Sequence, residues 1–124
     1  MSARILLIED NELNRYLATF LLEKRGYAVA CANDGPQGIT MAAEMIPDLI
    51  LLDIQLPSMD GYAVARSLRA EPVLNHVPIV AVTSYAMPGD REKALDAGCN
   101  GYIEKPINPD TFTEEISAYL RHEI

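Results

Sequence analysis

Three acidic residues of this sequence stand at the ends of short apolar runs. Glu9 and Asp10 follow residues 5–8, and Asp53 follows residues 49–52. An apolar run of this length, bounded by turn residues, is typical of a strand buried on both faces. An acid at the end of such a strand either caps a turn or takes part in chemistry, and the segment around Asp53 alone does not decide between the two.

Two more polar residues stand in comparable places. Thr83 follows the apolar run 77–82, and Lys105 comes soon after the short run 101–103. In a parallel sheet the carboxyl ends of the strands share one edge, and ligands bind at that edge. We therefore expect the three acids, the hydroxyl and the lysine to meet at one place.

Three carboxylates at one place need a counter-charge. Two unit charges about 4 Å apart repel by roughly 4 kcal/mol at an effective dielectric constant near 20, so either one acid stays protonated or a cation neutralises the group. Oxygen ligands without histidine or cysteine favour Mg²⁺, with Mn²⁺ as the alternative, over zinc. Lys105 and Thr83 offer what the remaining oxygens of a phosphoryl group need. The set predicts phosphoryl transfer onto Asp53, because an ionised carboxylate needs no general base to act as a nucleophile.

Each of these residues also has a simpler interpretation. Asp10 or Asn11 would cap the helix that follows. Thr83 would be an ordinary residue at a strand end, and Lys105 a solvated charge. Their predicted convergence, rather than any one residue, favours the functional interpretation.

Five strands that alternate with five helices must position these residues. The expected strands are residues 5–8, 27–32, 49–53, 77–82 and 101–103. Such alternation is typical of an α/β fold, with a parallel sheet, helices on both faces and right-handed crossovers. The first, third and fourth strands are the most apolar and should be central, which gives the doubly wound order 2-1-3-4-5. The strand order then reverses between the first and third strands, and there we expect the ligand.

Apolar residues at helical spacing predict the buried faces of four helices. The first helix is expected to end at Gly26, the second at Pro47 and the third by Glu71, and the fourth to run from about Asp90 to Gly98. The expected inner residues are Leu13, Leu17, Phe20 and Leu21 of the first helix; Ile39, Ala42, Ala43 and Ile46 of the second; Val64 and Leu68 of the third; and Phe112, Ile116, Tyr119 and Leu120 of the fifth.

Length and composition narrow the class of protein. The 124 residues suit one domain, residues 1–124, without an output domain. The net charge of −8 argues against direct binding of nucleic acid, which needs clustered cations. Cys31 and Cys99 follow no metal-ligand spacing and are expected to be buried thiols. The sequence has neither a signal peptide nor an apolar run that could insert into a membrane, so we expect a cytoplasmic protein.

Together these residues resemble the response-regulator receiver domain of two-component signalling. The resemblance covers essentially the whole chain and implies a (βα)5 flavodoxin-like receiver fold. Within this family the chain looks most like a stand-alone, single-domain receiver of the DivK type. The motifs that carry the resemblance are Glu9-Asp10, Asp53 with Pro57, Met59-Asp60-Gly61, Thr83 and Lys105-Pro106.

The resemblance assigns a role to each residue of the expected site. Asp53 is similar to the phosphoacceptor, which receives its phosphoryl group from a histidine kinase or a histidine phosphotransfer protein. Asp10 and Asp53 resemble the direct Mg²⁺ ligands, with the backbone carbonyl of Gln55 as a third ligand and Glu9 acting through water. Lys105 resembles the lysine that contacts the phosphoryl group.

The resemblance also implies how a signal would leave the site. Thr83 and Tyr102 stand at the two switch positions: the hydroxyl of Thr83 turns toward the phosphoryl group, and Tyr102 rotates into the space left behind. The fourth helix, fifth strand and fifth helix would then change their affinity for a downstream effector. Ser84 stands where alanine is usual, which makes the rate of phosphotransfer uncertain, and Tyr85 is expected to slow the loss of phosphate.

Several other functions compete with this one. The chain could be a receiver-like binding module that acts without phosphorylation, or a receiver excised from a larger regulator or hybrid kinase. An aspartate-nucleophile phosphatase needs a second aspartate two residues after the nucleophile, and Gln55 cannot serve as one. A flavodoxin-like carrier is disfavoured because the acids that follow residue 8 would repel a flavin phosphate. We therefore expect a signalling protein rather than an enzyme.

Overall fold

The computed structural model describes residues 3–56, 59–84 and 88–121 and contains one parallel sheet of five strands in the order β2-β1-β3-β4-β5. This is the predicted fold class and strand order, and both are confirmed. The elements in chain order are β1 (Arg4–Ile8), α1 (Glu12–Lys24), β2 (Ala28–Ala32), α2 (Gly35–Met45), β3 (Leu49–Asp53), α3 (Gly61–Arg69), the short 3-10 helix η1 (Pro72–Leu74), β4 (Ile79–Thr83), α4 (Asp90–Asp96), β5 (Gly101–Glu104) and α5 (Phe112–Arg121).

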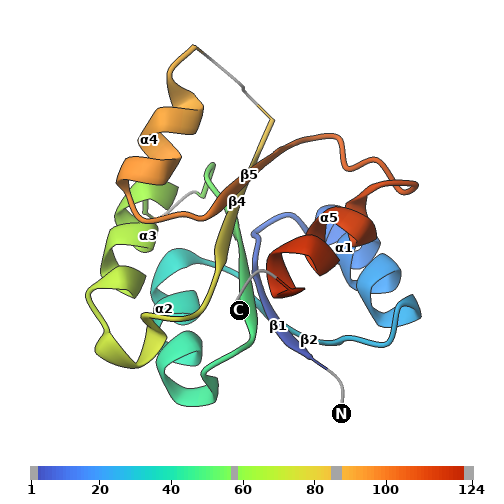
Figure 1. The fold of residues 1–124 in the computed structure, drawn as a ribbon, viewed down its shortest axis with the longest axis horizontal. Helices are drawn as coiled ribbons and strands as arrows, with labels where there is room; N and C mark the ends of the chain where they lie inside the picture. The colour runs from blue at the N-terminus through green and yellow to red at the C-terminus, as the bar shows by residue number, and fades with distance from the viewer. Residues whose placement is uncertain (1–2, 57–58, 85–87, 122–124) are drawn as a thin grey trace.

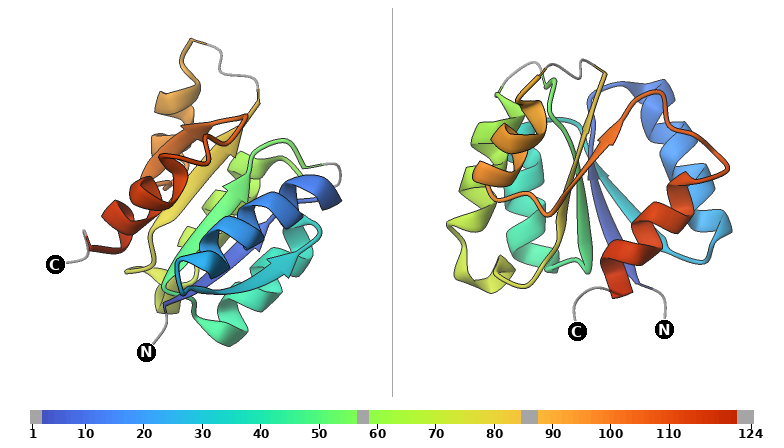
Figure 2. Two further views of the ribbon diagram at one scale, coloured as in Figure 1. Left: turned by 90° about the vertical axis from the view of Figure 1, so that its right-hand side faces the viewer. Right: turned by 45° about the horizontal axis from the view of Figure 1, so that its top comes forward.

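Helices cover both faces of the sheet. Figures 1 and 2 show α2, α3 and α4 on one face and α1 with α5 on the other. Each face has its own apolar core, because alternate residues of the central strands point to opposite sides. All residues of β3 and β4 are buried, so these two strands form the rigid centre of the molecule, as their uninterrupted apolar sequences predicted.

The predicted inner face of α1 is wrong in part. Leu13 and Phe20 were expected inside, yet they are 74% and 51% exposed. The helix instead buries Ala18 and Leu22 against the sheet. The spacing rule selected the largest apolar residues, whereas a helix that packs closely on a sheet places a small residue such as Ala18 at the point of contact.

The predicted inner face of α2 is also wrong in part. Ala42 is buried as expected, but Ala43 and Ile46 are exposed. The helix turns Gly38 toward the sheet, so closely that a Cβ atom there would lie 2.5 Å from the Cδ1 atom of Ile8. Gly38 thus faces the sheet, although a prediction based on apolar side chains does not count glycine as an inner residue.

The inner faces of the other two helices match the prediction. Val64 and Leu68 of α3 are fully buried, as are Phe112 and Ile116 of α5. Tyr119 and Leu120, which also belong to α5, are partly buried and pack against the same core. The two thiols differ, since Cys99 is buried as expected but Cys31 only partly.

The start of α3 packs tightly on the chain next to Asp53. The N–H of Gly61 donates to the carbonyl of Ile54 at 3.1 Å, and a Cβ atom on Gly61 would lie 2.4 Å from the Cα atom of Ile54. Asp60 caps α3 by accepting from the N–H of Tyr62 at 3.3 Å. The Met59-Asp60-Gly61 motif therefore has a steric reason, because only glycine allows α3 to begin directly against the segment that carries the central acid.

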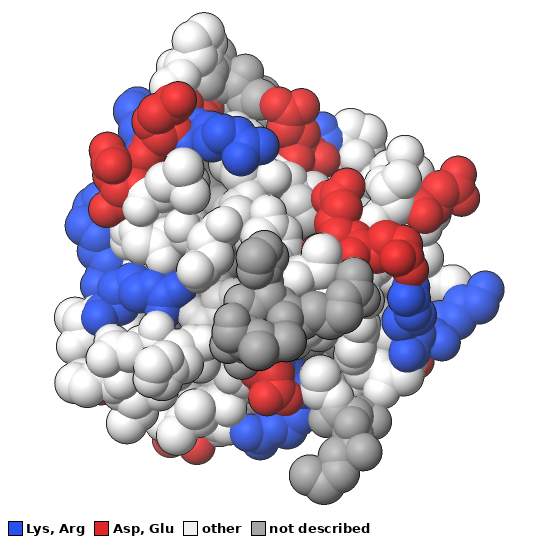
Figure 3. Space-filling view, in the orientation of Figure 1, with Lys and Arg blue, Asp and Glu red and all other residues white. Residues whose placement is uncertain are grey.

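Charged side chains form separate groups on the face seen in Figure 3. They gather over α3 and α4 on one side and over α1 and α5 on the other, with uncharged side chains over much of the area between. Arg25 and Glu114 form an ion pair at 2.6 Å that links the end of α1 to α5. Within the described residues, no helix is both long and apolar enough to cross a membrane.

The corrected face of α1 can be tested by two matched truncations. Leu22→Ala removes a fully buried side chain and should lower the free energy of unfolding by about 2–5 kcal/mol. Leu13→Ala removes an exposed side chain and should change the free energy of unfolding by about 0.5 kcal/mol or less. Urea unfolding followed by circular dichroism measures both. Equal losses in the two variants would contradict this orientation of the helix.

Candidate functional site

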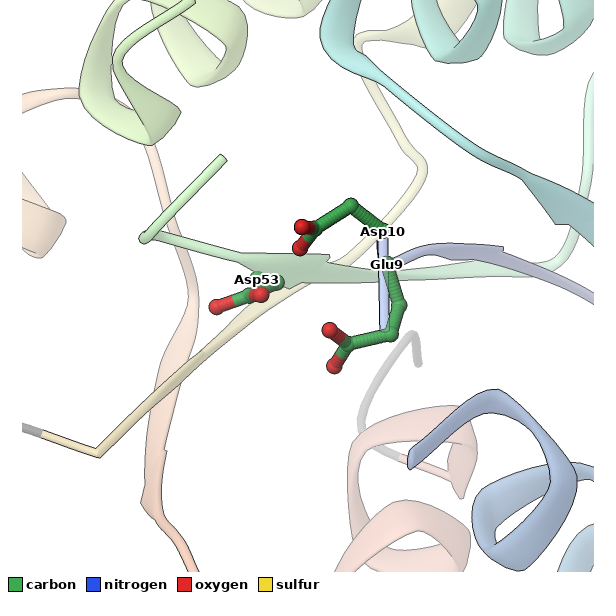
Figure 4. Close-up of side chains that lie close together, drawn as sticks. All are labelled: Glu9, Asp10 and Asp53. Atoms are coloured by element: carbon green, nitrogen blue, oxygen red, sulfur yellow. The ribbon is translucent and has the colours of Figure 1, made fainter. Parts of the chain in front are cut away.

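The three acids lie together at the carboxyl edge of the sheet. β1 pairs with β3 so that Ile8 lies beside Leu52, which brings Glu9, Asp10 and Asp53 to one place. One carboxylate oxygen from each acid lies within 4.8 Å of those of the other two. In Figure 4 the side chains of Glu9 and Asp10 flank the end of β3 that carries Asp53. The cluster forms where the strand order reverses, which is the position predicted from the sequence.

Side chains at the start of α1 hold the backbone that precedes the helix. Asn11 caps the helix, because its Oδ1 accepts from the N–H of Asn14 at 2.9 Å. Asp10 is therefore not the helix cap, and its exposed carboxylate faces the cluster. One guanidinium nitrogen of Arg15 donates to the carbonyls of Glu9 and Asp10, at 2.9 and 3.0 Å. Sequence reasoning missed Arg15, since a cation one turn into a helix resembles any other surface charge.

Lys105 connects two of the acids. Its Nζ donates to Oε1 of Glu9 at 2.9 Å and lies 3.4 Å from Oδ2 of Asp53. The lysine side chain is only 10% exposed, so it is not the solvated charge of the simpler interpretation. The backbone N–H of Lys105 donates to the carbonyl of Thr83 at 2.7 Å, which fixes the lysine to the end of β4.

Burial acts on the charge state of Glu9. Loss of water raises the pKa of the Glu9 carboxyl above its ordinary value, and the neighbouring Asp53 raises it further. The Lys105 ammonium lowers the same pKa, but the net direction is upward. Three acids share this edge with Lys105, so a bound cation would relieve their mutual repulsion.

A second polar group lies between β3 and β4. The N–H of Gln55 donates to Oδ1 of Asp53 at 3.0 Å. The Gln55 side chain reaches across to β4, where Nε2 donates to Oγ1 of Thr83 at 2.8 Å and Oε1 accepts from the N–H of Ser84 at 3.1 Å. Neither contact of the Gln55 side chain was predicted from the sequence, because the direction of a loop side chain depends on the tertiary structure.

Tyr102 lies farther along the same side of the sheet. It pairs with Ala81 across β4 and β5, and its ring packs against the core beneath α3 and α4. Its hydroxyl is buried, and none of the described residues hydrogen-bonds to it. The guanidinium of Arg91 lies 5.6 Å from the ring centre. Pro57 and Tyr85, which the sequence analysis also singled out, lie outside the described residues.

The family model described as "Response regulator receiver domain" matches residues 5–117. The chain belongs to this family. Receivers of this kind are signalling proteins of two-component systems rather than enzymes. The predicted family and the predicted class of protein are both confirmed.

Individual relatives agree with this assignment. The polar-differentiation response regulator DivK of Brucella ovis is 42% identical over 120 residues, which cover 97% of this chain and 98% of the relative. A receiver domain protein from Methanospirillum hungatei is 28% identical and superposes with a TM-score of 0.92, over 99% of this chain and 97% of that one.

One solved relative bears on the acidic cluster. It is the receiver domain of a sensor histidine kinase from Pseudomonas aeruginosa, described with a magnesium ion coordinated in its active-site cleft. That chain is 36% identical and has a TM-score of 0.89, over 98% of this receiver and 99% of its own length. The acidic cluster of the present receiver offers oxygen atoms of the type that Mg²⁺ prefers, so it is a candidate site for this ion.

The support that Arg15 gives to the cluster can be tested by metal binding. Arg15→Ala frees the carbonyls of Glu9 and Asp10, and the loosened carboxylates should bind Mn²⁺ about tenfold more weakly. Electron paramagnetic resonance of free Mn²⁺ measures this affinity. Arg25→Ala changes the net charge by the same amount far from the cluster and serves as the matched control. Equal affinities in the two variants would show that Arg15 has no such role.

Proposed function

We propose that this receiver is a phosphorylation-dependent switch whose Asp53 accepts a phosphoryl group from the phosphohistidine of a kinase or a phosphotransfer protein. The observation that supports it most is the setting of Asp53. This buried carboxylate lies at the ligand-binding edge of the sheet, with the Lys105 ammonium 3.4 Å from one of its oxygens and two further acids around it.

The residues around Asp53 suit transfer without a general base. The N–H of Gln55 holds Oδ1, which turns Oδ2 toward Lys105. A carboxylate oxygen of Asp53 attacks phosphorus and forms a P–O bond, while the P–N bond of the donor breaks and its electron pair stays on the imidazole. The ammonium of Lys105 then faces the transferred oxygens and offsets their charge.

The acidic residues fit a hard divalent cation. Asp10 and Asp53 would bind it directly, together with the backbone carbonyl of Gln55. Glu9, whose carboxylate pairs with Lys105, would act through a water molecule. When bound, Mg²⁺, or Mn²⁺ in its place, supplies positive charge beside the phosphoryl oxygens.

The response to phosphorylation would pass through Thr83 and Tyr102. Thr83 is buried at the end of β4 beside the site, and Tyr102 lies on the neighbouring strand. The Tyr102 hydroxyl has no partner among the described residues, so its rotation breaks no hydrogen bond to them. The change would alter α4, β5 and α5, and an effector protein would read this face.

The phosphoryl donor would dock on the start of α1. We name Leu13, Tyr16 and Phe20 the α1 apolar patch; these side chains are 74%, 69% and 51% exposed. The helix begins two residues after Asp10, so the patch borders the acidic cluster. A protein that brings a phosphohistidine to Asp53 must cover this edge, and the patch gives it apolar surface to bury.

Acetyl phosphate tests the phosphoacceptor. With Mg²⁺ present, the chain should gain the mass of one phosphoryl group in intact-mass spectrometry, and Asp53→Asn should gain none. Removal of the metal with a chelator should abolish the gain. Asp96→Asn, a matched change at an exposed acid of α4, should be phosphorylated normally. No gain with any small phosphodonor would favour a binding module that acts without phosphorylation.

Two donors of different size test the α1 apolar patch. Leu13→Asp should slow transfer from a phosphorylated histidine kinase about tenfold, because a lost apolar contact at an interface costs about 1–2 kcal/mol. Transfer from acetyl phosphate, which needs no docking, should stay within about twofold. Leu95→Asp, at an exposed leucine of α4, is the control. An equal loss with both donors would show damage to the site instead of to docking.

A further inference from the structure

The side chain of Gln55 bridges the two central strands at their carboxyl ends. Its Nε2 donates to Oγ1 of Thr83 and its Oε1 accepts from the N–H of Ser84, at 2.8 and 3.1 Å. We name this pair of hydrogen bonds the Gln55 clasp. A backbone N–H can only donate, so the oxygen of the carboxamide must face Ser84 and the nitrogen must face Thr83. The orientation of the side chain is thus determined by its partners.

The same residue also contacts the phosphoacceptor. The backbone N–H of Gln55 donates to Oδ1 of Asp53 at 3.0 Å. Gln55 therefore touches the carboxylate with its main chain and the end of β4 with its side chain. Gln55 thus connects Asp53 to both Thr83 and Ser84.

The main chain of β4 is held on both sides next to the clasp. The carbonyl of Val82 accepts from the N–H of Ile54 at 3.0 Å, and the carbonyl of Thr83 accepts from the N–H of Lys105 at 2.7 Å. These bonds tie β4 to β3 and to β5. A response at this point consequently falls on the side chains of Thr83 and Gln55 rather than on the strand.

We propose that Gln55 is a positioning residue that holds the unphosphorylated arrangement of Thr83 and Ser84, so that phosphorylation of Asp53 has to open the clasp. The inference rests on the function proposed above. Oxygens added to Asp53 compete for the donors at the end of β4, and one of these, the N–H of Ser84, is occupied by Oε1 of Gln55. Rotation of the Thr83 hydroxyl toward those oxygens likewise ends its contact with Nε2 of Gln55.

The clasp sets how readily the receiver becomes active. A hydrogen bond of this type changes an equilibrium constant by a factor of about two to ten. A receiver without the clasp should visit the active arrangement more often and accept phosphate faster. The affinity for the divalent cation should not change, because the proposed ligand from Gln55 is its backbone carbonyl and is kept in any side-chain variant.

Gln55→Met tests the clasp, because methionine keeps the length of the side chain and loses both hydrogen bonds. Hydrogen exchange followed by NMR should show the Ser84 amide proton exchanging at least fivefold faster than in the wild-type receiver. Phosphorylation by acetyl phosphate at saturating Mg²⁺ should be about three- to tenfold faster. The Mg²⁺ concentration for half-maximal rate should stay within about twofold. Gln55→Ala should repeat these results if methionine perturbs the packing.

The controls separate a clasp from ordinary packing. Gln37 also accepts a backbone N–H through Oε1, from Asn33 at 2.6 Å, so Gln37→Met is the matched variant and should leave all three measurements unchanged. If the wild-type receiver takes up phosphate, an unchanged or slower phosphorylation rate in both Gln55 variants would overturn the inference. An unchanged exchange rate at Ser84 would also overturn it. Failure of the wild-type receiver to take up phosphate would instead refute the proposed function, and the inference with it.

Discussion

Like charges at the edge of a buried sheet are the constraint on which this receiver depends. Carboxylate oxygens of Glu9, Asp10 and Asp53 lie within 4.8 Å of one another, although two of these acids are almost completely buried. Such a group is stable only with positive charge beside it. Lys105 supplies part of that charge from the far edge of the sheet, and burial raises the pKa of the Glu9 carboxyl. The cluster is therefore a candidate site for a divalent cation.

The two apolar cores allow the charges to be held in place. β3 is buried along its whole length between β1 and β4, so Asp53 at its end cannot move away from its neighbours. Two tight contacts on one face of the sheet support this arrangement: Gly38 lets α2 approach β1, and Gly61 lets α3 begin against Ile54. Interiors packed to this density transmit displacements instead of absorbing them. A rigid support is what a small change at one carboxylate needs in order to reach a distant surface.

The site separates parts that are fixed from parts that can move. Backbone hydrogen bonds hold the ends of β3, β4 and β5 to one another, whereas the side chains of Gln55 and Thr83 hydrogen-bond to each other between β3 and β4. The arrangement concentrates any response in a few side-chain rotamers. Under the proposed function, a response would reach α4, β5 and α5 while these backbone hydrogen bonds stay in place.

The sequence by itself determined the strand order, the central strands and the edge where the acids meet, because these follow from apolar runs and from the rules of parallel sheets. It also placed Val64, Leu68, Phe112 and Ile116 correctly, from their helical spacing. Only the tertiary structure decided which face of α1 is buried, because Ala18 and Leu22 fit the sheet more closely than the larger stripe that includes Phe20. It also decided the roles of Arg15 and of the Gln55 side chain. Arg15 reaches back from α1 to the carbonyls of Glu9 and Asp10, and the Gln55 side chain crosses from the end of β3 to the end of β4. The direction of each side chain depends on how its surroundings pack, and the pattern of apolar residues does not encode it.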